Sequence, residues 1–234
     1  MCYTATQVSK TYQYQDFYKA SLSPFVVEED ISTYYKADGF THPNLVVIVQ
    51  KESGTEVELM QWGLLPNWKK PLPEMMKLSN STLNAKRETV RTLPSFKNSI
   101  INKRCIVPVN SFFEYKNVDG DKLPYLIHPK SQPLFNLAGL YSFYKNPEND
   151  QWIKSFTIVT QEANEFMADI HNSAKRMPLM LSNELINDWM NPDSPSSMVD
   201  EILKFSCNDE SLLAYRVRRD LKKALNDESV LMPI

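Results

Sequence analysis

The second residue of the chain is a cysteine, and it follows the initiator methionine directly. Methionine aminopeptidases remove Met1 when the next side chain is small, as that of Cys2 is. The processed chain would carry a thiol and a free α-amine on one residue. An α-amine has a reference pKa of about 7.7–8.0, so it is substantially neutral near physiological pH and can attack carbonyl groups. The alternative is that Cys2 belongs to a frayed terminus without function.

Four further stretches place acidic, basic and amide side chains beside apolar and aromatic ones. Three of their residues suit proton transfer or substrate orientation, but each also has an ordinary structural explanation. Asn84 suits a helix cap, Glu114 an exposed strand position, and His171 a structural or surface position. The stretches are Trp62-Gly63-Leu64-Leu65-Pro66-Asn67-Trp68, Asn84-Ala85-Lys86-Arg87-Glu88-Thr89, Arg104-Cys105-Ile106-Val107-Pro108-Val109-Asn110-Ser111-Phe112-Phe113-Glu114-Tyr115 and His171-Asn172-Ser173-Ala174-Lys175-Arg176-Met177-Pro178.

Strand alternation within the third stretch gives Glu114 an unusual setting. It places the carboxylate on the same face of the strand as Phe112. An apolar environment raises the pKa of a carboxyl group, which can then act as a general acid and base near neutrality. The pattern therefore makes Glu114 a candidate for proton transfer.

The composition is that of an ordinary folded protein. The chain has 234 residues, of which 42% are hydrophobic, enough for one domain spanning residues 1–234 with a substantial core. Three cysteines without a C-x-x-C pair favour neither a disulfide framework nor a thiolate metal site, and we expect no metal and no cofactor. Without a leader or a bilayer-length apolar run, we expect a cytoplasmic monomer that does not associate with membranes.

Charge is distributed unevenly along the chain, although its net value is only −2. Residues 62–130 hold twelve Lys and Arg against five Asp and Glu, a net charge of +7, whereas residues 1–61 carry −4 and residues 131–234 carry −5. A basic middle third is typical of a polyanion-binding surface. A solvated face with scattered lysines explains it equally well, and charge alone does not separate the two.

The hydrophobic pattern predicts many strands and few βαβ alternations. This favours an α+β domain around a curved, barrel-like, mostly antiparallel sheet with peripheral helices. Strands are predicted over residues 45–51, 56–62, 104–109, 112–118, 123–128, 135–144, 152–160, 177–181 and 212–217. Helices are predicted over residues 94–102, 163–170, 185–190, 197–205 and 220–225, with an untidy helical face over 6–20, irregular chain over 24–42, and a loop rich in Lys and Pro after Trp68.

Taken with Cys2 and the segment Ala138-Gly139-Leu140-Tyr141, the four stretches resemble the SRAP family (SOS response-associated peptidase). That family typically reads M-C-G-R, W-G-L-I-P-x-W, N-A-R-x-E-T, R-C-(I/L)-(I/V)-P-x-x-G-(F/Y)-(F/Y)-E-W, A-G-L-(W/Y) and H-x-R-M-P, in this order. The resemblance implies an α+β fold with a barrel-like β core and a positively charged DNA channel. It also implies a covalent bond to abasic sites in single-stranded DNA, formed during the SOS response to DNA damage.

The resemblance assigns roles to four side chains. The α-amine of Cys2 would condense with the aldehyde of the ring-opened abasic sugar, and its thiol would close a thiazolidine ring. Glu114 would transfer protons, and Asn84 would orient the sugar. His171 would promote ring opening and assist a lyase-like reversal of the crosslink. Autoproteolytic removal of Met1 would free the amine.

DNA contacts are expected from basic residues in and near these motifs and from one tryptophan. Trp68 could stack on an unpaired base, whereas Trp62 is expected in the core. Bound to single-stranded DNA, the protein would be nucleoid-associated. The basic side chains that could neutralise phosphates are Lys69, Lys70, Lys77, Lys86, Arg87, Arg91, Lys103, Arg104, Lys175 and Arg176.

Four departures from the family pattern affect DNA affinity and geometry, and none removes a reacting group. Tyr3-Thr4 replaces Gly-Arg after the cysteine, which removes a cation that commonly faces DNA. Lys86 replaces an arginine and loses the bidentate fork. Asn110-Ser111 replaces a small residue and glycine, and four residues instead of one separate His171 from Arg176.

Two other functions would use the same residues. A thiol peptidase would employ Cys2 as nucleophile, with His171 and Glu114 as its partners, on protein substrates. A non-catalytic reader of single-stranded or modified DNA would keep its binding after Cys2→Ala. A metal enzyme is disfavoured because the His and Cys spacings match no ligand pattern.

Overall fold

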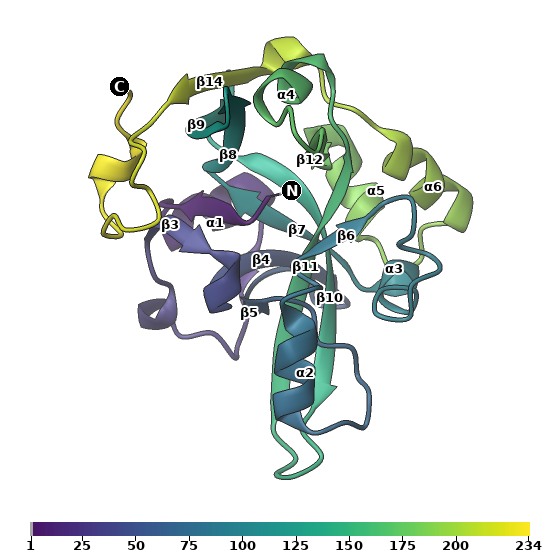
Figure 1. Cartoon of the computed structure of the whole chain (residues 1–234). Helices are drawn as coiled ribbons and strands as arrows, with labels where there is room; N and C mark the ends of the chain where they lie inside the picture. Colours follow the sequence, from purple (N-terminus) through teal and green to yellow (C-terminus); the bar gives the residue numbers. More distant parts are fainter. Residues whose placement is uncertain (1) are drawn as a thin grey trace.

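A closed five-stranded barrel forms the centre of the computed structural model, which describes residues 2–234 (Figure 1). Its strands run in the order β11-β10-β7-β4-β5, and each of these neighbours is antiparallel. Parallel pairing of β5 with β11 closes the ring, so that no barrel edge is left to pair with another chain. The strands are β4 (Asn44–Lys51), β5 (Gly54–Trp62), β7 (Arg104–Val109), β10 (Phe135–Lys145) and β11 (Trp152–Glu162).

A second antiparallel sheet, in the order β14-β9-β8-β1-β3, lies beside the barrel (Figure 1). Only Asn110 separates β7 of the barrel from β8 of this sheet, so the chain passes directly from one sheet to the other. The second sheet consists of β1 (Thr4–Gln7), β3 (Tyr34–Asp38), β8 (Ser111–Val118), β9 (Asp121–Pro129) and β14 (Leu212–Arg216).

Short strands and helices surround the two sheets. Together, the barrel, the second sheet and these peripheral elements confirm the predicted α+β class with a barrel-like core. In the part of the chain described, no helix is both long and apolar enough to cross a membrane. The short strands are β2 (Ser21–Leu22), β6 (Asn84–Lys86), β12 (Arg176–Pro178) and β13 (Met180–Leu181). The helices are α1 (Thr11–Tyr18), α2 (Leu72–Ser79), α3 (Ser99–Asn102), α4 (Glu165–Ile170), α5 (Ile186–Met190) and α6 (Ser196–Lys204), with 3₁₀ turns η1 (Glu28–Asp30), η2 (Gly39–Thr41), η3 (Asn183–Leu185), η4 (Asp209–Ser211) and η5 (Glu228–Leu231).

Alternation along the barrel strands separates two hydrophobic cores. Val47 and Val49 of β4 belong to the cluster that includes Cys2, whereas Val46 and Ile48 belong to the cluster covered by α1, α5 and α6. At Gly139 a Cβ atom would lie only 2.8 Å from the sulfur of Cys105, so glycine is required where β10 passes β7.

Five local expectations from the sequence were wrong. Of the helix predicted over residues 94–102, only Ser99–Asn102 is helical. Residues 6–20 begin in strand β1 and only then form α1, and the stretch 24–42 contains strand β3. The loop after Trp68 contains helix α2, which starts beside prolines at positions where a missing N–H costs nothing. Residues 220–225 form turns rather than a helix, because the ammonium of Lys36 binds the carbonyl groups of Leu221 and Ala224.

The buried carboxamide of Gln7 connects β1 to the barrel through hydrogen bonds. Its Nε2 donates to the carbonyls of Val46 and Pro108 at 2.9 and 2.7 Å, and its Oε1 accepts from the Val46 amide at 2.8 Å. Strands β4 and β7 pair directly at only two positions, so the Gln7 side chain satisfies backbone groups where these strands separate. The strand that begins two residues after Cys2 is thereby fixed in place.

Replacement of Gln7 by leucine should lower the free energy of unfolding by about 3 kcal/mol, because three buried backbone groups lose their partners. Urea denaturation followed by tryptophan fluorescence would measure the change. Gln151→Leu, at an exposed position, should stay within about 0.5 kcal/mol of the parent. Equal stabilities of the two variants would contradict the bridging role of Gln7.

Candidate functional site

Cys2 lies in the main hydrophobic core, with its side chain fully buried. Asn84, the first residue of β6, donates from Nδ2 to the Cys2 carbonyl at 2.9 Å. Strand β6 is itself held in register by parallel pairing of Asn84 with Ile158 of β11. The backbone of Cys2 is thus fixed by a residue 82 positions away, and Asn84 is a strand residue rather than a helix cap.

Antiparallel pairing of β1 with β8 brings the start of the chain alongside Glu114. The register aligns Ala5 with Phe112 and Thr6 with Ser111, so residues before Ala5 run towards Glu114. The Glu114 side chain is only 4% exposed, and this burial raises its pKa to about 7. Near neutral pH the carboxyl group therefore exchanges its proton readily. Phe112 packs in the core cluster of Cys2, whereas Phe113 packs in another cluster, which confirms the predicted alternation along this strand.

His171 ends helix α4 and faces Glu114 across the site. Its Nε2 lies 3.7 Å from Oε2 of Glu114, and its Nδ1 lies 2.8 Å from the carbonyl oxygen of Arg176. Because a carbonyl only accepts hydrogen bonds, Nδ1 carries the proton of the neutral ring. Burial lowers the pKa of His171, which favours the neutral ring near pH 7. Nε2 is then a proton acceptor that faces Glu114.

The thiol of Cys2 is held in its protonated form. Burial raises its pKa well above the ordinary value, and the carboxylate of Glu114 raises it further. A buried thiol with a raised pKa is a poor nucleophile by itself, because the thiolate is the reactive species. The structure therefore brings Cys2, Asn84, Glu114 and His171 together, but it does not activate the sulfur.

Glu114 and His171 line a cavity of about 290 Å³. A second cavity of about 250 Å³ adjoins it and shares three of its lining residues, Tyr3, Tyr115 and Lys222. Lys122 and Lys222 also line the first cavity. Sequence reasoning missed them because isolated lysines in turns resemble ordinary solvated residues. The other lining residues of the first cavity are Tyr3, Tyr115, Asn117 and Ser173.

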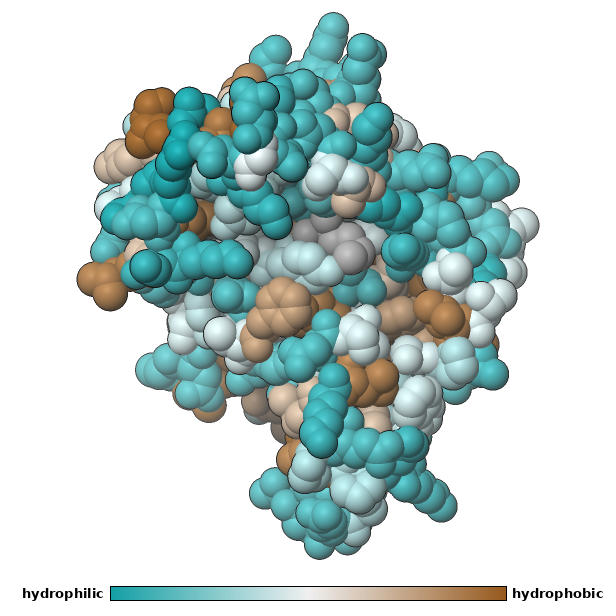
Figure 2. Space-filling model, viewed as in Figure 1, coloured by the Kyte–Doolittle hydropathy of each residue, from teal (hydrophilic) through white to brown (hydrophobic). Residues whose placement is uncertain are grey.

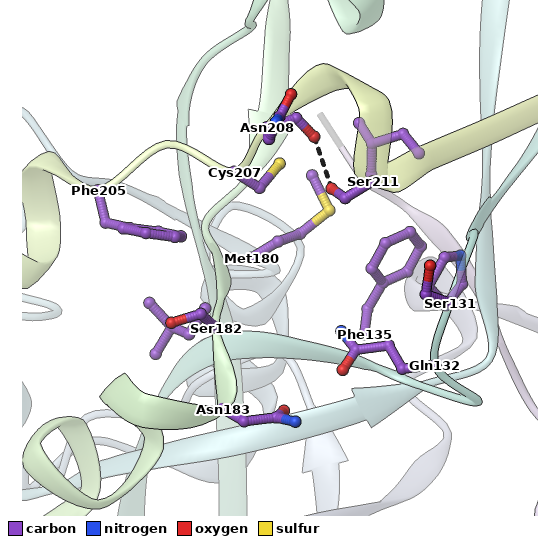
Figure 3. A pocket seen from close by; sticks show the side chains of 13 residues that line it. Ser131, Gln132, Phe135, Met180, Ser182, Asn183, Phe205, Cys207, Asn208 and Ser211 are labelled. Carbon is purple, nitrogen blue, oxygen red and sulfur yellow. Dashed lines mark hydrogen bonds between the residues drawn. The ribbon is translucent and has the colours of Figure 1, made fainter.

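Another cavity, of about 470 Å³, shares no lining residue with the first (Figure 3). It is lined by Phe135, Met180 and Cys207 together with uncharged polar side chains, and none of its lining residues is acidic or basic. Burial raises the pKa of Cys207 to about 11, and Asp209 contributes. This thiol is therefore protonated near neutrality, and the cavity offers no group suited to acid–base or nucleophilic chemistry.

The predicted phosphate-binding role of Arg104 is wrong. Its side chain is 1% exposed, and its guanidinium donates to the carbonyl groups of Ile100, Ile101, Trp189 and Asn191. A planar group with five donors is well suited to gather these carbonyls at the ends of α3 and α5. Arg104 stabilises the packing of helices on the barrel and is not accessible to DNA.

Two other arginines of the predicted DNA surface are held by protein groups. Arg176 forms two hydrogen bonds with the Glu88 carboxylate, at 2.7 and 3.0 Å, and a third with the Thr160 carbonyl. Arg87 donates to Gln161 and to the carbonyl of Leu203. These contacts hold β6 and β12 on either side of β11, so much of the charge and hydrogen-bonding capacity of Arg87 and Arg176 is already used.

The loop after Trp62 lies apart from the second sheet. Trp62 is fully buried against Phe156, as expected, whereas Trp68 is half-buried in a small cluster under α2 with Leu65 and Tyr144. Figure 1 shows α2 projecting from the barrel away from the second sheet. Lys70 is paired with Glu74 in this helix. Lys69, Lys86 and Lys175 are exposed, so contact of these residues with DNA stays a prediction.

Comparisons with known proteins identify the family of the chain. The family model described as SOS response associated peptidase (SRAP) matches residues 1–224. The abasic site processing protein YoaM of Bacillus subtilis is 33% identical over 192 residues, which cover 81% of this chain and 80% of YoaM. The abasic site processing protein HMCES of Gallus gallus is 28% identical over 196 residues, which cover 75% of this chain and 56% of HMCES. A crystal structure of a Bacteroides thetaiotaomicron protein superimposes with a TM-score of 0.91 at 29% identity over the whole of both chains. The chain therefore belongs to the SRAP family, as its motifs predicted.

Proposed function

We propose that this protein processes abasic sites by forming a covalent crosslink between Cys2 and single-stranded DNA. The observation that carries the proposal is the position of Cys2, with its carbonyl held by Asn84 and with Glu114 and His171 3.7 Å apart beside it. The names of the relatives, abasic site processing proteins, agree with it. Removal of Met1, which lies outside the described residues, is part of the proposal because the reaction needs the α-amine of Cys2.

The first step joins the α-amine to the aldehyde carbon of the ring-opened sugar. A C–N bond forms, the electrons of the C=O double bond move to the oxygen, and the carboxylate of Glu114 carries one amine proton to that oxygen to give the carbinolamine. The protonated carboxyl then protonates the hydroxyl, which leaves as water, and the carboxylate recovers a proton when the nitrogen loses its second hydrogen to give the imine. A pKa of about 7 lets one group perform both transfers near neutrality.

The second step joins the thiol to the imine carbon. A C–S bond forms, the S–H proton ends on the nitrogen, and a five-membered thiazolidine results. Because the amine reacts first, the sulfur need not be a free thiolate, which agrees with the raised pKa of the buried thiol. A serine at this position would lack the soft sulfur nucleophile, and an internal cysteine would lack the amine.

His171 and Asn84 prepare the sugar. Neutral His171 donates its Nδ1 proton to the Arg176 carbonyl and can accept the C1 hydroxyl proton of the closed sugar at Nε2. The bond from C1 to the ring oxygen then breaks, the proton passes to that oxygen, and the aldehyde results. Within residues 2–234, the buried Oδ1 of Asn84 accepts no hydrogen bond, although Nδ2 donates to Cys2. A buried amide oxygen without a donor is costly, and a hydroxyl group of the bound sugar would satisfy it.

The thiol-peptidase alternative has less support. A peptidase of this kind attacks with a thiolate, and its base lies beside the sulfur. Here burial and a neighbouring carboxylate both favour the protonated thiol of Cys2. The reader of modified DNA remains distinguishable by experiment, because its binding would not depend on the cysteine.

Cys2 variants should separate these mechanisms. Cys2→Ala should give no adduct with an abasic single-stranded oligonucleotide in intact-mass spectra after denaturation. Cys2→Ser should give an imine that survives only if borohydride reduces it, because no thiazolidine forms. Cys207→Ala, which removes a thiol in another part of the fold, should crosslink like the parent. Stable adducts of Cys2→Ala would exclude the proposed chemistry.

The state of the N-terminus should control activity. Protein verified by intact mass to retain Met1 should form no thiazolidine, because its Cys2 nitrogen is in a peptide bond. The same preparation should become active after treatment with a methionine aminopeptidase. Crosslinking by protein that keeps Met1 throughout the assay would contradict the role of the amine.

The raised pKa of Glu114 should appear in the pH dependence of stability. Between pH 4.5 and pH 7 the folded protein binds this proton more tightly than the unfolded chain, so the contribution is complete at low pH and is lost as pH rises through about 7. As pH rises from 4 to 9, the free energy of unfolding of the parent, measured relative to that of Glu114→Gln, should fall by up to about 3 kcal/mol. Urea titrations at each pH would measure it, with exposed Glu52→Gln as the control. A parallel pH dependence of parent and Glu114→Gln would show that Glu114 is not perturbed.

A further inference from the structure

Two lysines from distant parts of the chain line the cavity that contains Glu114 and His171. Lys122 lies at the start of β9, and Lys222 lies in the turn that follows β14. Both are exposed. Figure 2 shows hydrophilic side chains over most of the upper part of the molecule, where Figure 1 places β9, β14 and the C-terminal segment.

The turn that carries Lys222 is anchored on both sides of that residue. Leu221 is 1% exposed in a small core with Phe113 and Val230. The ammonium of Lys36 in β3 donates to the carbonyls of Leu221 and Ala224 at 2.8 and 2.7 Å. The backbone of Lys222 is therefore held in place at the cavity, although its side chain is exposed.

Cross-links between segments also fix the other walls of the cavity. Arg219, in the turn of Lys222, pairs with Asp121, the neighbour of Lys122, at 3.0 Å. Asn172, the neighbour of His171, forms two hydrogen bonds with the backbone of Asn117 at 2.9 and 2.8 Å. The two lysines are thus placed relative to Glu114 and His171 by contacts that do not use their own side chains.

Lys122 and Lys222 each bring a positive charge to the lining of this cavity. Among the described residues 2–234, neither lysine forms an ion pair, and Glu114 is the one carboxyl group that lines the cavity. Since Glu114 has a pKa of about 7, it is partly neutral under physiological conditions. Two like charges at one cavity repel each other unless an anion lies between them.

We propose that Lys122 and Lys222 bind a backbone phosphate of the DNA next to the abasic sugar. The inference rests on the proposed function and adds to it the residues that hold the strand at the cavity. Lysine suits this role because its ammonium is a point charge that tolerates several positions of a phosphate group. The two lysines act as positioning residues, since they place the sugar and take no part in bond formation.

Thr4 provides a way to test the charge itself. Thr4 and Lys222 line the adjoining cavity together, so an arginine at position 4 would supply a cation close to the place of the Lys222 ammonium. Asp38 also lines this cavity and lies opposite Thr4 in the pairing of β1 with β3, so an arginine at position 4 would share its charge with this carboxylate. Thr4→Arg should therefore compensate in part for the loss of Lys222.

The experiment measures non-covalent binding to a single-stranded oligonucleotide with a tetrahydrofuran site, which has no aldehyde and forms no crosslink. Fluorescence anisotropy over a salt series gives Kd and its salt dependence. Lys122→Ala and Lys222→Ala should each raise Kd several-fold and lower the slope of log K against log salt by about 0.7. Lys223→Ala, an exposed neighbour that lines neither cavity, should leave both unchanged, and Thr4→Arg should restore part of the binding lost in Lys222→Ala.

Crosslinking to a true abasic site, followed by intact mass, separates the two proposals. If the parent crosslinks but both cavity variants bind like Lys223→Ala, the phosphate role is wrong and the proposed function stands. If the parent binds without a salt dependence, the phosphate role is also wrong. If the parent forms no adduct at all, the proposed function fails. Equal thermal unfolding of all variants would show that binding losses do not come from misfolding.

Discussion

The carboxyl group of Glu114 is buried between the start of the chain and His171, and the chemistry of the site depends on this burial. An exposed glutamate would be ionised near neutrality and would return protons poorly. Removal from water raises its pKa to about 7. The burial is achieved by pairing of β1 with β8, and β1 is held in turn by the three hydrogen bonds of Gln7. A backbone interaction thus sets the protonation of a side chain.

The same burial has the opposite consequence for the sulfur of Cys2. Desolvation disfavours the charged form of the thiol and of the carboxyl group alike, and so raises both pKa values. Because the ordinary pKa of a thiol is already above 7, this rise moves the thiol pKa further from neutral pH. One environment therefore places the carboxyl group where it can exchange protons and suppresses the thiolate. This difference fits a reaction in which the amine attacks first and the sulfur second. It does not fit a reaction that begins with attack by a thiolate.

The basic residues carry the same charge but differ in burial, pairing and position relative to the site. Arg104, in the middle of a predicted DNA-binding motif, is buried under four carbonyl groups, and Arg176 is held by Glu88. Lys122 and Lys222 belong to no motif, yet they line the cavity of Glu114. A guanidinium can satisfy many internal acceptors at once, which makes it suitable for structural use. The exposed lysines keep their charge available to solvent and ligands.

Much of the architecture could be predicted from the sequence because it follows from local pattern. An apolar β-branched run predicted β4, alternation predicted β5, and β7, β10 and β11 were also predicted as strands, while the motif order identified the family. Strands β1 and β3 were missed because their short polar sequences become strands only through their partners, β8 and each other. Helix α2 was missed because its prolines resemble a loop until their place at the helix start is known.

For the site, the sequence by itself determined the reactive groups: a cysteine at position 2, a glutamate behind an aromatic pair, an asparagine and a histidine. Their side chains fix which reactions are chemically accessible. Tertiary structure alone decided which protonation states they adopt and which cations face them, because burial and charge proximity depend on segments more than a hundred residues apart, such as β8 and the turn of Lys222. The 1,2-aminothiol is a property of the sequence, and its proton-transferring environment is a property of the fold.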